Sequence, residues 1–147
     1  MRKWWLKSFE DLGTKELYNL LQLRAEVFVV EQNCPYQDLD GKDLQALHLC
    51  CQENDSIIAY SRILDKGISY PGHASIGRVI VKERHRKHNL GRELMRRSID
   101  SCRENYSGPI KISAQCYLEN FYRAFGFEPL GASYLEDDIP HIAMTLE

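Results

Sequence analysis

The feature that most constrains the fold is a change of hydrophobic period in the middle of the chain. Residues 74–81, ASIGRVIV, form a β-rich run, and after a polar stretch the apolar residues recur at Leu90, Leu94, Met95, Ile99 and Cys102. Apolar residues at every third or fourth position indicate an amphipathic helix, which buries one face. A strand followed by such a helix predicts an α/β domain, in which helices cover a sheet.

The remaining segments extend this pattern in both directions. The sequence predicts a short aromatic-rich strand at 4–9 and a helix that starts after Thr14, as its N-cap, and continues to Phe28. A polar connection of hairpin length at 53–56 predicts that the runs on either side of it pair antiparallel. We therefore expect a mixed sheet with helices on both faces; its other predicted elements are strands at 47–52, 57–64, 110–114, 127–130 and 141–146 and helices at 90–104 and 117–125.

Length and apolar content indicate a single domain over residues 1–147. The commonest domain size is about 100–150 residues, and a chain with 44% hydrophobic residues can build a core. The longest apolar runs fall far short of the roughly 18 residues that a membrane-spanning helix needs. The N-terminus lacks the apolar stretch of a secretion signal, so we expect a cytoplasmic protein without membrane contact.

The five cysteines do not form a recognisable framework. Their number is odd, and they lie within apolar or periodic segments, which favours reduced and mostly buried thiols. A metal site built from Cys34, His48, Cys50 and Cys51 lacks any C-x-x-C pair, and neighbours on a strand point to opposite faces. We therefore expect no metal.

The strand-to-helix connection carries most of the charge signal. The chain has a net charge of −2, yet residues 78–97 contain eight Lys or Arg against Glu83 and Glu93, a local net charge of +6. A helix start adds unpaired backbone N–H groups and the positive end of the helix dipole, so phosphate is the expected guest. Asn89 and Gly91 tolerate unusual backbone angles and allow close approach. A merely solvated helix start is the alternative.

Two motifs here resemble the GCN5-related N-acetyltransferase (GNAT) superfamily. Residues 86–91, RKHNLG, match motif A, Gln/Arg-x-x-Gly-x-Gly/Ala, except that Asn89 replaces the first glycine. Residues 114–127, AQCYLENFYRAFGF, resemble motif B, a strand leading to a helix that ends in Tyr-x-x-x-Gly-Phe. The segment 17–32, LYNLLQLRAEVFVVEQ, is similar to the ElaA-like subfamily, as are Cys34, Tyr36, Asp38, Asp40, Gly41, His48 and Ile139–His141.

This resemblance covers nearly the whole chain and implies both fold and activity. The implied fold is a single-domain GNAT-like mixed, mostly antiparallel sheet with a splayed strand pair at the cofactor site. The implied activity is acetyl-CoA-dependent N-acetylation, by direct transfer to a primary amine of a small molecule or peptide. The backbone of Val79 would polarise the thioester carbonyl, and a donor fixed in advance acts as an oxyanion hole. The implied cofactor-binding residues are Val79, Ile80, Val81, Arg84, Arg86, Lys87, His88, Asn89, Leu90, Gly91, Arg92, Gln115, Asn120 and Tyr122.

The resemblance assigns a general acid but leaves the general base open. The resemblance places Tyr122 as the general acid that protonates the departing thiolate. Relatives with a glutamate early on the central strand would have it near Ser75, which cannot act as a base. His141 and Glu31 are the leading candidates for the base, and His73 is a third. The acids of 31–43 and 136–138 could attract a cationic amine, or could simply be solvated.

Two further functions compete with acetyl transfer. A non-catalytic CoA-binding regulatory module would keep the phosphate loop without turnover, and the missing strand glutamate motivates it. Nucleic-acid binding is disfavoured by the net charge and by the lack of aromatics within the basic cluster. An unpaired edge strand leaves a homodimer open. The sequence does not specify the acceptor amine.

Overall fold

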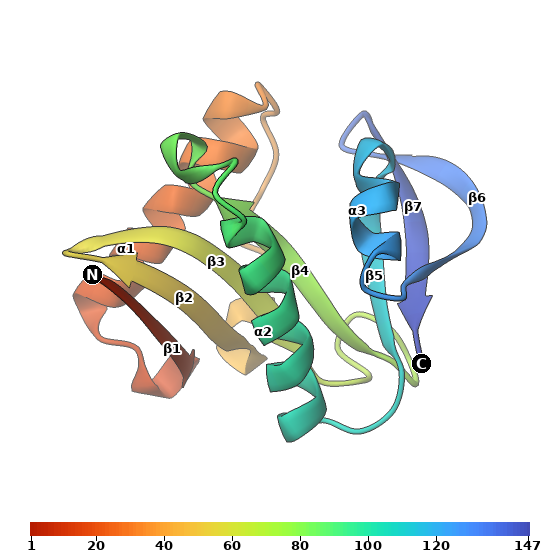
Figure 1. Ribbon diagram of the computed structural model, residues 1–147, viewed down its shortest axis with the longest axis horizontal. Helices are drawn as coiled ribbons and strands as arrows, with labels where there is room; N and C mark the ends of the chain where they lie inside the picture. Colours follow the sequence, from red (N-terminus) through yellow and green to blue (C-terminus); the bar gives the residue numbers. More distant parts are fainter.

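Seven strands form one sheet in the order β1-β2-β3-β4-β5-β7-β6 (Figure 1). The computed structural model describes all residues 1–147. Neighbouring strands are antiparallel, except that β4 and β5 run parallel. The strands are β1 (Arg2–Ser8), β2 (Leu47–Glu53), β3 (Ser56–Leu64), β4 (Ala74–Val81), β5 (Ile110–Gln115), β6 (Glu128–Glu136) and β7 (Ile139–Leu146).

Helices cover both faces of the sheet, as predicted (Figure 1). Alternate strand residues face opposite sides of the sheet. Cys50 therefore packs with the helix Thr14–Arg24, whereas Cys51 packs with the helix Leu90–Asn105. No helix is both long and apolar enough to cross a bilayer. The helices are α1 (Thr14–Arg24), continued by a π-helix, η2 (Ala25–Glu31), then α2 (Leu90–Asn105) and α3 (Glu119–Arg123), with 3-10 turns η1 (Phe9–Asp11), η3 (Lys42–Gln45), η4 (Glu83–His85) and η5 (Cys116–Leu118).

Three local predictions need correction. The N-cap of α1 is Gly13 rather than Thr14, because the Gly13 N–H donates to Glu16 Oε1 at 2.9 Å. The predicted helix at 117–125 is shorter, since η5 precedes the five-residue α3. The final strands extend to 136 and from 139, because Asp137 and Asp138 both adopt positive φ. Two such residues form a tight hairpin turn.

The sheet splits between β4 and β5. These parallel strands pair only at Ala74 with Ile110 and at Ser75 with Lys111. Beyond Ser75, the edge of β4 that faces β5 has no strand partner, and its backbone groups stay available to a ligand. The predicted splayed strand pair is confirmed.

A β-bulge distorts β4 just beyond the point where it separates from β5. Arg78 and Val79 together stand opposite Ser61 of β3, and Arg78 has φ of +49°. The extra residue reverses the facing of the strand. Ile76 packs on the α2 side, whereas Ile80 packs on the α1 side. The bulge therefore aims the backbone of Val79 differently from that of a regular strand.

Candidate active site

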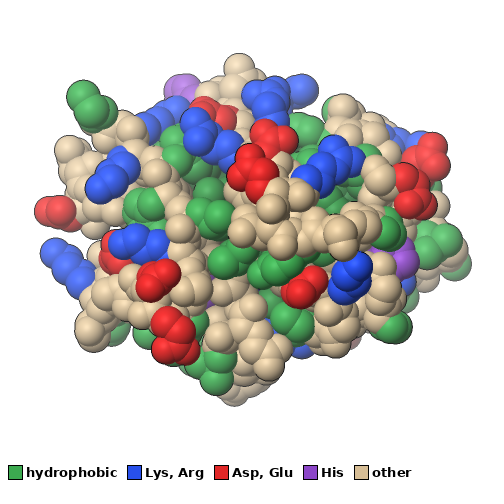
Figure 2. Space-filling view, turned by 90° about the horizontal axis from the view of Figure 1, so that it is seen from below, with side chains coloured by type: hydrophobic (Ala, Val, Ile, Leu, Met, Phe, Trp, Pro, Cys, Tyr) green, Lys and Arg blue, Asp and Glu red, His purple; other side chains and the backbone are tan.

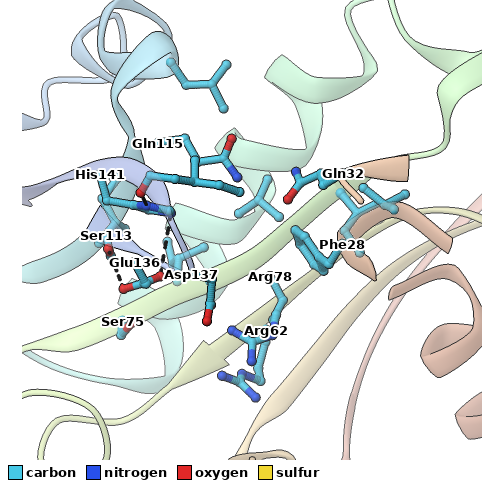
Figure 3. Close-up of a pocket in the computed structure, with 18 of the residues that line it drawn as sticks. Phe28, Gln32, Arg62, Ser75, Arg78, Ser113, Gln115, Glu136, Asp137 and His141 are labelled. Atoms are coloured by element: carbon cyan, nitrogen blue, oxygen red, sulfur yellow. Dashed lines mark hydrogen bonds and ion pairs between the residues drawn. The ribbon is translucent and has the colours of Figure 1, made fainter. Parts of the chain in front are cut away.

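A cleft of about 950 Å³ opens where β4 and β5 diverge (Figure 3). Its walls come from both strands, the π-helix, the loop 32–40, α3 and the turn between β6 and β7. On the face in Figure 2, basic and acidic side chains are interspersed among hydrophobic ones. Of the residues assigned by sequence, those lining it are Glu31, Val79, Ile80, Val81, Arg86, Gly91, Gln115, Tyr122 and His141.

The start of α2 forms one end of the cleft. Asn89 precedes the helix with φ of +60°. Asparagine adopts positive φ more readily than most other non-glycine residues, so it suits this position. A Cβ on Gly91 would lie 3.8 Å from Val81 Cγ2 and 3.9 Å from Phe121 Cζ, so packing within the chain does not demand glycine here. The bare backbone instead suits close approach of a ligand.

The other residues assigned to the cofactor lie outside the cleft lining. Leu90 is buried in the core beneath the helix start. Asn89 and Arg92 line a separate, shallower cavity along α2, and Asn120 is exposed. Arg84, Lys87 and His88 are exposed around the helix start.

Glu31 and Arg86, which both line the cleft, form a two-point ion pair. The two Nη groups of Arg86 donate to Glu31 Oε2 at 2.6 Å and Oε1 at 3.0 Å, and its Nε–H donates to the Val81 carbonyl at 2.8 Å. This fork geometry is the strong form of an arginine–carboxylate contact. Both oxygens of Glu31 are therefore occupied, which weakens its candidacy as a base.

Tyr122 places a protonated phenol at the cleft wall. Burial raises its pKa to about 12, so the hydroxyl keeps its proton at neutral pH. Phe121 and Phe127 meet its ring edge-on and fix its orientation. This environment suits a group that donates a proton.

His141 lies in β7, next to Gln115 of β5. Its Nδ1–H donates to the Ile139 carbonyl at 2.7 Å, because a carbonyl can only accept. That contact leaves Nε2 of the neutral ring as the acceptor, 3.6 Å from Glu136 Oε2. Ser113 Oγ donates to the other Glu136 oxygen at 3.2 Å. His73, the third candidate base, is not among the lining residues.

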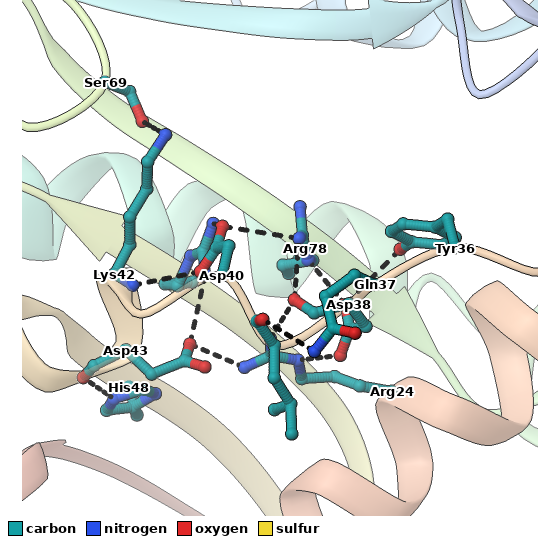
Figure 4. Close-up of polar contacts among 12 residues, drawn as sticks. Arg24, Tyr36, Gln37, Asp38, Asp40, Lys42, Asp43, His48, Ser69 and Arg78 are labelled. Atoms are coloured by element: carbon teal, nitrogen blue, oxygen red, sulfur yellow. Dashed lines mark hydrogen bonds and ion pairs between the residues drawn. The ribbon is translucent and has the colours of Figure 1, made fainter.

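The acidic loop is not simply solvated. Asp38 accepts from Arg24 Nε at 2.9 Å, and Asp43 accepts from Arg24 Nη1 at 2.7 Å (Figure 4). Asp40 accepts two hydrogen bonds from Arg62, which hold its pKa at about 2 against the opposing effect of burial. Asp38, Asp40 and Asp43 are thus bound to arginines, so for these three residues neither interpretation offered from sequence holds.

A buried histidine completes this network. His48 Nε2–H donates to the Asp43 carbonyl at 3.0 Å, so its Nδ1 accepts from the Tyr60 hydroxyl at 2.6 Å. Burial lowers the pKa of His48. The neutral ring therefore supports the loop that carries the aspartates.

The sequence reasoning missed the half of the cleft formed by Arg62, Arg78, Lys42, Ser69 and Tyr70. One signal could have found part of it. Arg62 and Arg78 are charged residues inside otherwise apolar strands, and a buried charge needs a partner.

The comparisons with known proteins agree with this geometry. Residues 11–147 match the family model described as an acetyltransferase (GNAT) domain. The chain belongs to the GNAT acetyltransferase family. Protein ElaA of Escherichia coli is 45% identical over 150 residues, covering 100% of this chain and 97% of that protein. A UPF0039 protein of Schizosaccharomyces pombe is 38% identical, covering 96% of this chain and 94% of that protein.

Solved GNAT structures superpose closely on this one. An acyl-CoA N-acyltransferase from Pseudomonas aeruginosa has a TM-score of 0.94 at 43% identity, with 99% of each chain covered. E. coli ElaA has a TM-score of 0.93 at 44% identity, with each chain fully covered. The predicted family and fold class are confirmed, and the chain has the fold of GNAT acyl-CoA acyltransferases.

Proposed function

We propose that this protein is an acetyl-CoA-dependent N-acetyltransferase that acts on a primary amine of a small molecule or peptide. The observation that carries the proposal is the open, bulged edge of β4 beside a buried tyrosine. The pantetheine would pair with Ile80 and Val81, and the pyrophosphate would lie on the N-terminal amides of α2. GNAT membership and the open backbone at Gly91 support this placement.

The residues of the cleft can carry a direct transfer. His141 Nε2 takes a proton from the acceptor ammonium, with Glu136 stabilising the imidazolium. The amine nitrogen bonds to the thioester carbonyl carbon, and the Val79 N–H holds the charge that develops on oxygen. As the carbon–sulfur bond breaks, Tyr122 gives its proton to the leaving sulfur. The sulfur keeps the electron pair of the broken bond. The nitrogen, which still carries two protons after attack, releases one to solvent as the carbonyl re-forms, and His141 and Tyr122 then exchange protons with solvent to regain their starting states.

The register supports these roles. Ala74 of β4 stands opposite Ile110 in the parallel strand β5. Val79 lies five residues after Ala74, and Gln115 lies five residues after Ile110. Gln115 pairs with His141 in β7. Gln115 and His141 therefore lie side by side, and Val79 lies at a similar height along the cleft, less the one residue that the bulge adds to β4.

The first experiment is calorimetric titration with acetyl-CoA, CoA and dephospho-CoA after removal of co-purified ligand. Saturable binding followed by thiol release with an amine panel supports the proposal, with Tyr122→Phe as the control. Binding without turnover for any amine would favour the regulatory module. No binding at millimolar cofactor would overturn both.

A further inference from the structure

Most charged side chains in the cleft neutralise one another. Glu31 pairs with Arg86, and Asp40 pairs with both Arg62 and Arg78. The remaining charged lining residues have no ion pair with a fixed opposite charge; they are Lys42, Glu136 and Asp137. One cation and two anions are therefore free to meet a ligand.

Lys42 supplies the free positive charge. Its Nζ donates to Ser69 Oγ at 3.0 Å (Figure 4), and its side chain is only partly exposed. The Ser69 hydroxyl accepts from one of the three N–H groups of the Lys42 ammonium and does not neutralise its charge. The surrounding network does not offset this charge, because its three arginines, Arg24, Arg62 and Arg78, are balanced by Asp38, Asp40 and Asp43. This end of the cleft favours an anion.

Glu136 and Asp137 supply the free negative charges, beside His141 (Figure 3). Tyr70 follows Ser69 in the chain and lines the cleft, and Lys111 Nζ of β5 lies over its ring, 4.7 Å from the ring centroid. Two residues further along β5, Ser113 Oγ donates to Glu136 Oε1 at 3.2 Å. Both groups of charge therefore border the same half of the cleft, away from the start of α2.

We propose that the acceptor is a small amine that also carries a carboxylate, such as a free amino acid, with its ammonium at Glu136 and His141 and its carboxylate at Lys42. The inference rests on the proposed acetyl transfer and names its substrate class. Charge at both ends orients the acceptor, because reversing it would bring like charges together. A purely cationic amine would leave Lys42 unpaired.

The test compares amines that differ only in the carboxylate: phenylalanine with phenethylamine, lysine with cadaverine, and arginine with agmatine. Thiol release from acetyl-CoA is measured for the wild-type protein, Lys42→Met and Lys42→Arg. The matched control is Lys66→Met, because Lys66 also donates to a serine hydroxyl, that of Ser107, but outside the cleft. Circular dichroism checks the folding of each variant.

We expect at least one carboxylated acceptor to have a kcat/KM about tenfold or more above that of its partner amine, as for a charged hydrogen bond. Lys42→Met should raise its KM by a similar factor with kcat and acetyl-CoA affinity unchanged, and Lys42→Arg should restore much of it. Equal use of both amines, or an equal effect of Lys42→Met on both, would overturn this inference alone. If none of the amines is acetylated, the proposed function is overturned as well.

Discussion

The guanidinium of Arg78 is held by Asp38, a residue forty positions earlier in the chain. Arg78 Nε lies 2.7 Å from Asp38 Oδ1, and Nη2 lies 3.0 Å from the Asp38 carbonyl oxygen. Arg78 is also the bulged residue with positive φ. A non-glycine residue in that conformation is strained, and it persists only where its surroundings fix it. Asp38 thus tethers the bulge that presents Val79.

Asp38→Asn should therefore impair catalysis more than cofactor binding. The variant weakens the contacts of Asp38 with Arg78 and with the buried Arg24. Loss of one partner of a buried pair costs about 3 kcal/mol or more, and we expect a lower Tm together with a kcat at least about tenfold lower. Kinetics and thermal unfolding measure both effects, with Asp11→Asn as a surface control. A lower Tm with unchanged kcat would reduce Asp38 to a purely structural role.

Tyr122→Phe should lower kcat by about a hundredfold, the usual contribution of a general acid. The acetyl-CoA dissociation constant should stay unchanged, because the ring is retained. Since the pKa of Tyr122 is about 12, the wild-type rate should show no alkaline loss from this group up to about pH 10. Tyr106→Phe, in a tyrosine outside the cleft, is the control. Wild-type kcat in Tyr122→Phe would remove the assigned role.

Gly91→Ala should separate stability from ligand binding. The nearest atoms to the new Cβ lie 3.8 Å and 3.9 Å away, so the helix accepts it. Alanine should stabilise the fold by about 0.5–1 kcal/mol because glycine loses more backbone entropy. CoA affinity should change little, because motif A accepts alanine at this position. Denaturant unfolding and calorimetry report the two effects, with a pantetheine thioester without pyrophosphate as the control ligand. A large loss of CoA affinity without a loss for the pantetheine thioester would contradict the match of residues 86–91 to the motif.

Acid should destabilise the protein in two stages. Burial lowers the pKa of His48, so its stabilising contribution is present above the unfolded value of about 6.5 and is lost as pH falls through the lower folded value. Asp40, with a folded pKa of about 2, contributes above about pH 4 and loses its contribution as pH approaches 2. Chemical denaturation across this range measures the effect. Asp40→Asn should flatten the lower stage, and an unchanged slope would contradict it.

Much of the fold followed from local pattern. The β-rich run at 74–81, the helix from Leu90 and the hairpin between β2 and β3 lie close to their predicted limits. The extension of β6 to Glu136 was missed because this edge strand is largely exposed and lacks a buried alternating face. Its end depends on two aspartates with positive φ, which the sequence did not reveal.

The candidate site divides in the same way. The start of α2 and Tyr122 were identified from motifs that are contiguous in sequence. The half of the cleft that we propose binds the acceptor was not identified, because its charged residues come from segments far apart in the chain: Lys42, Arg62, Arg78 and Glu136. Their spacing carries no signal until the sheet brings them together.

The sequence by itself therefore determined the succession of elements and the basic helix start, since hydrophobic period and local charge act between near neighbours. Tertiary structure alone decided the insertion of β7 between β5 and β6, the bulge at Arg78, and the pairing of the loop aspartates with three arginines. Those features depend on burial and on contacts between distant residues. The same contacts decide which charges stay free in the cleft, and those charges are the basis of the acceptor that we propose.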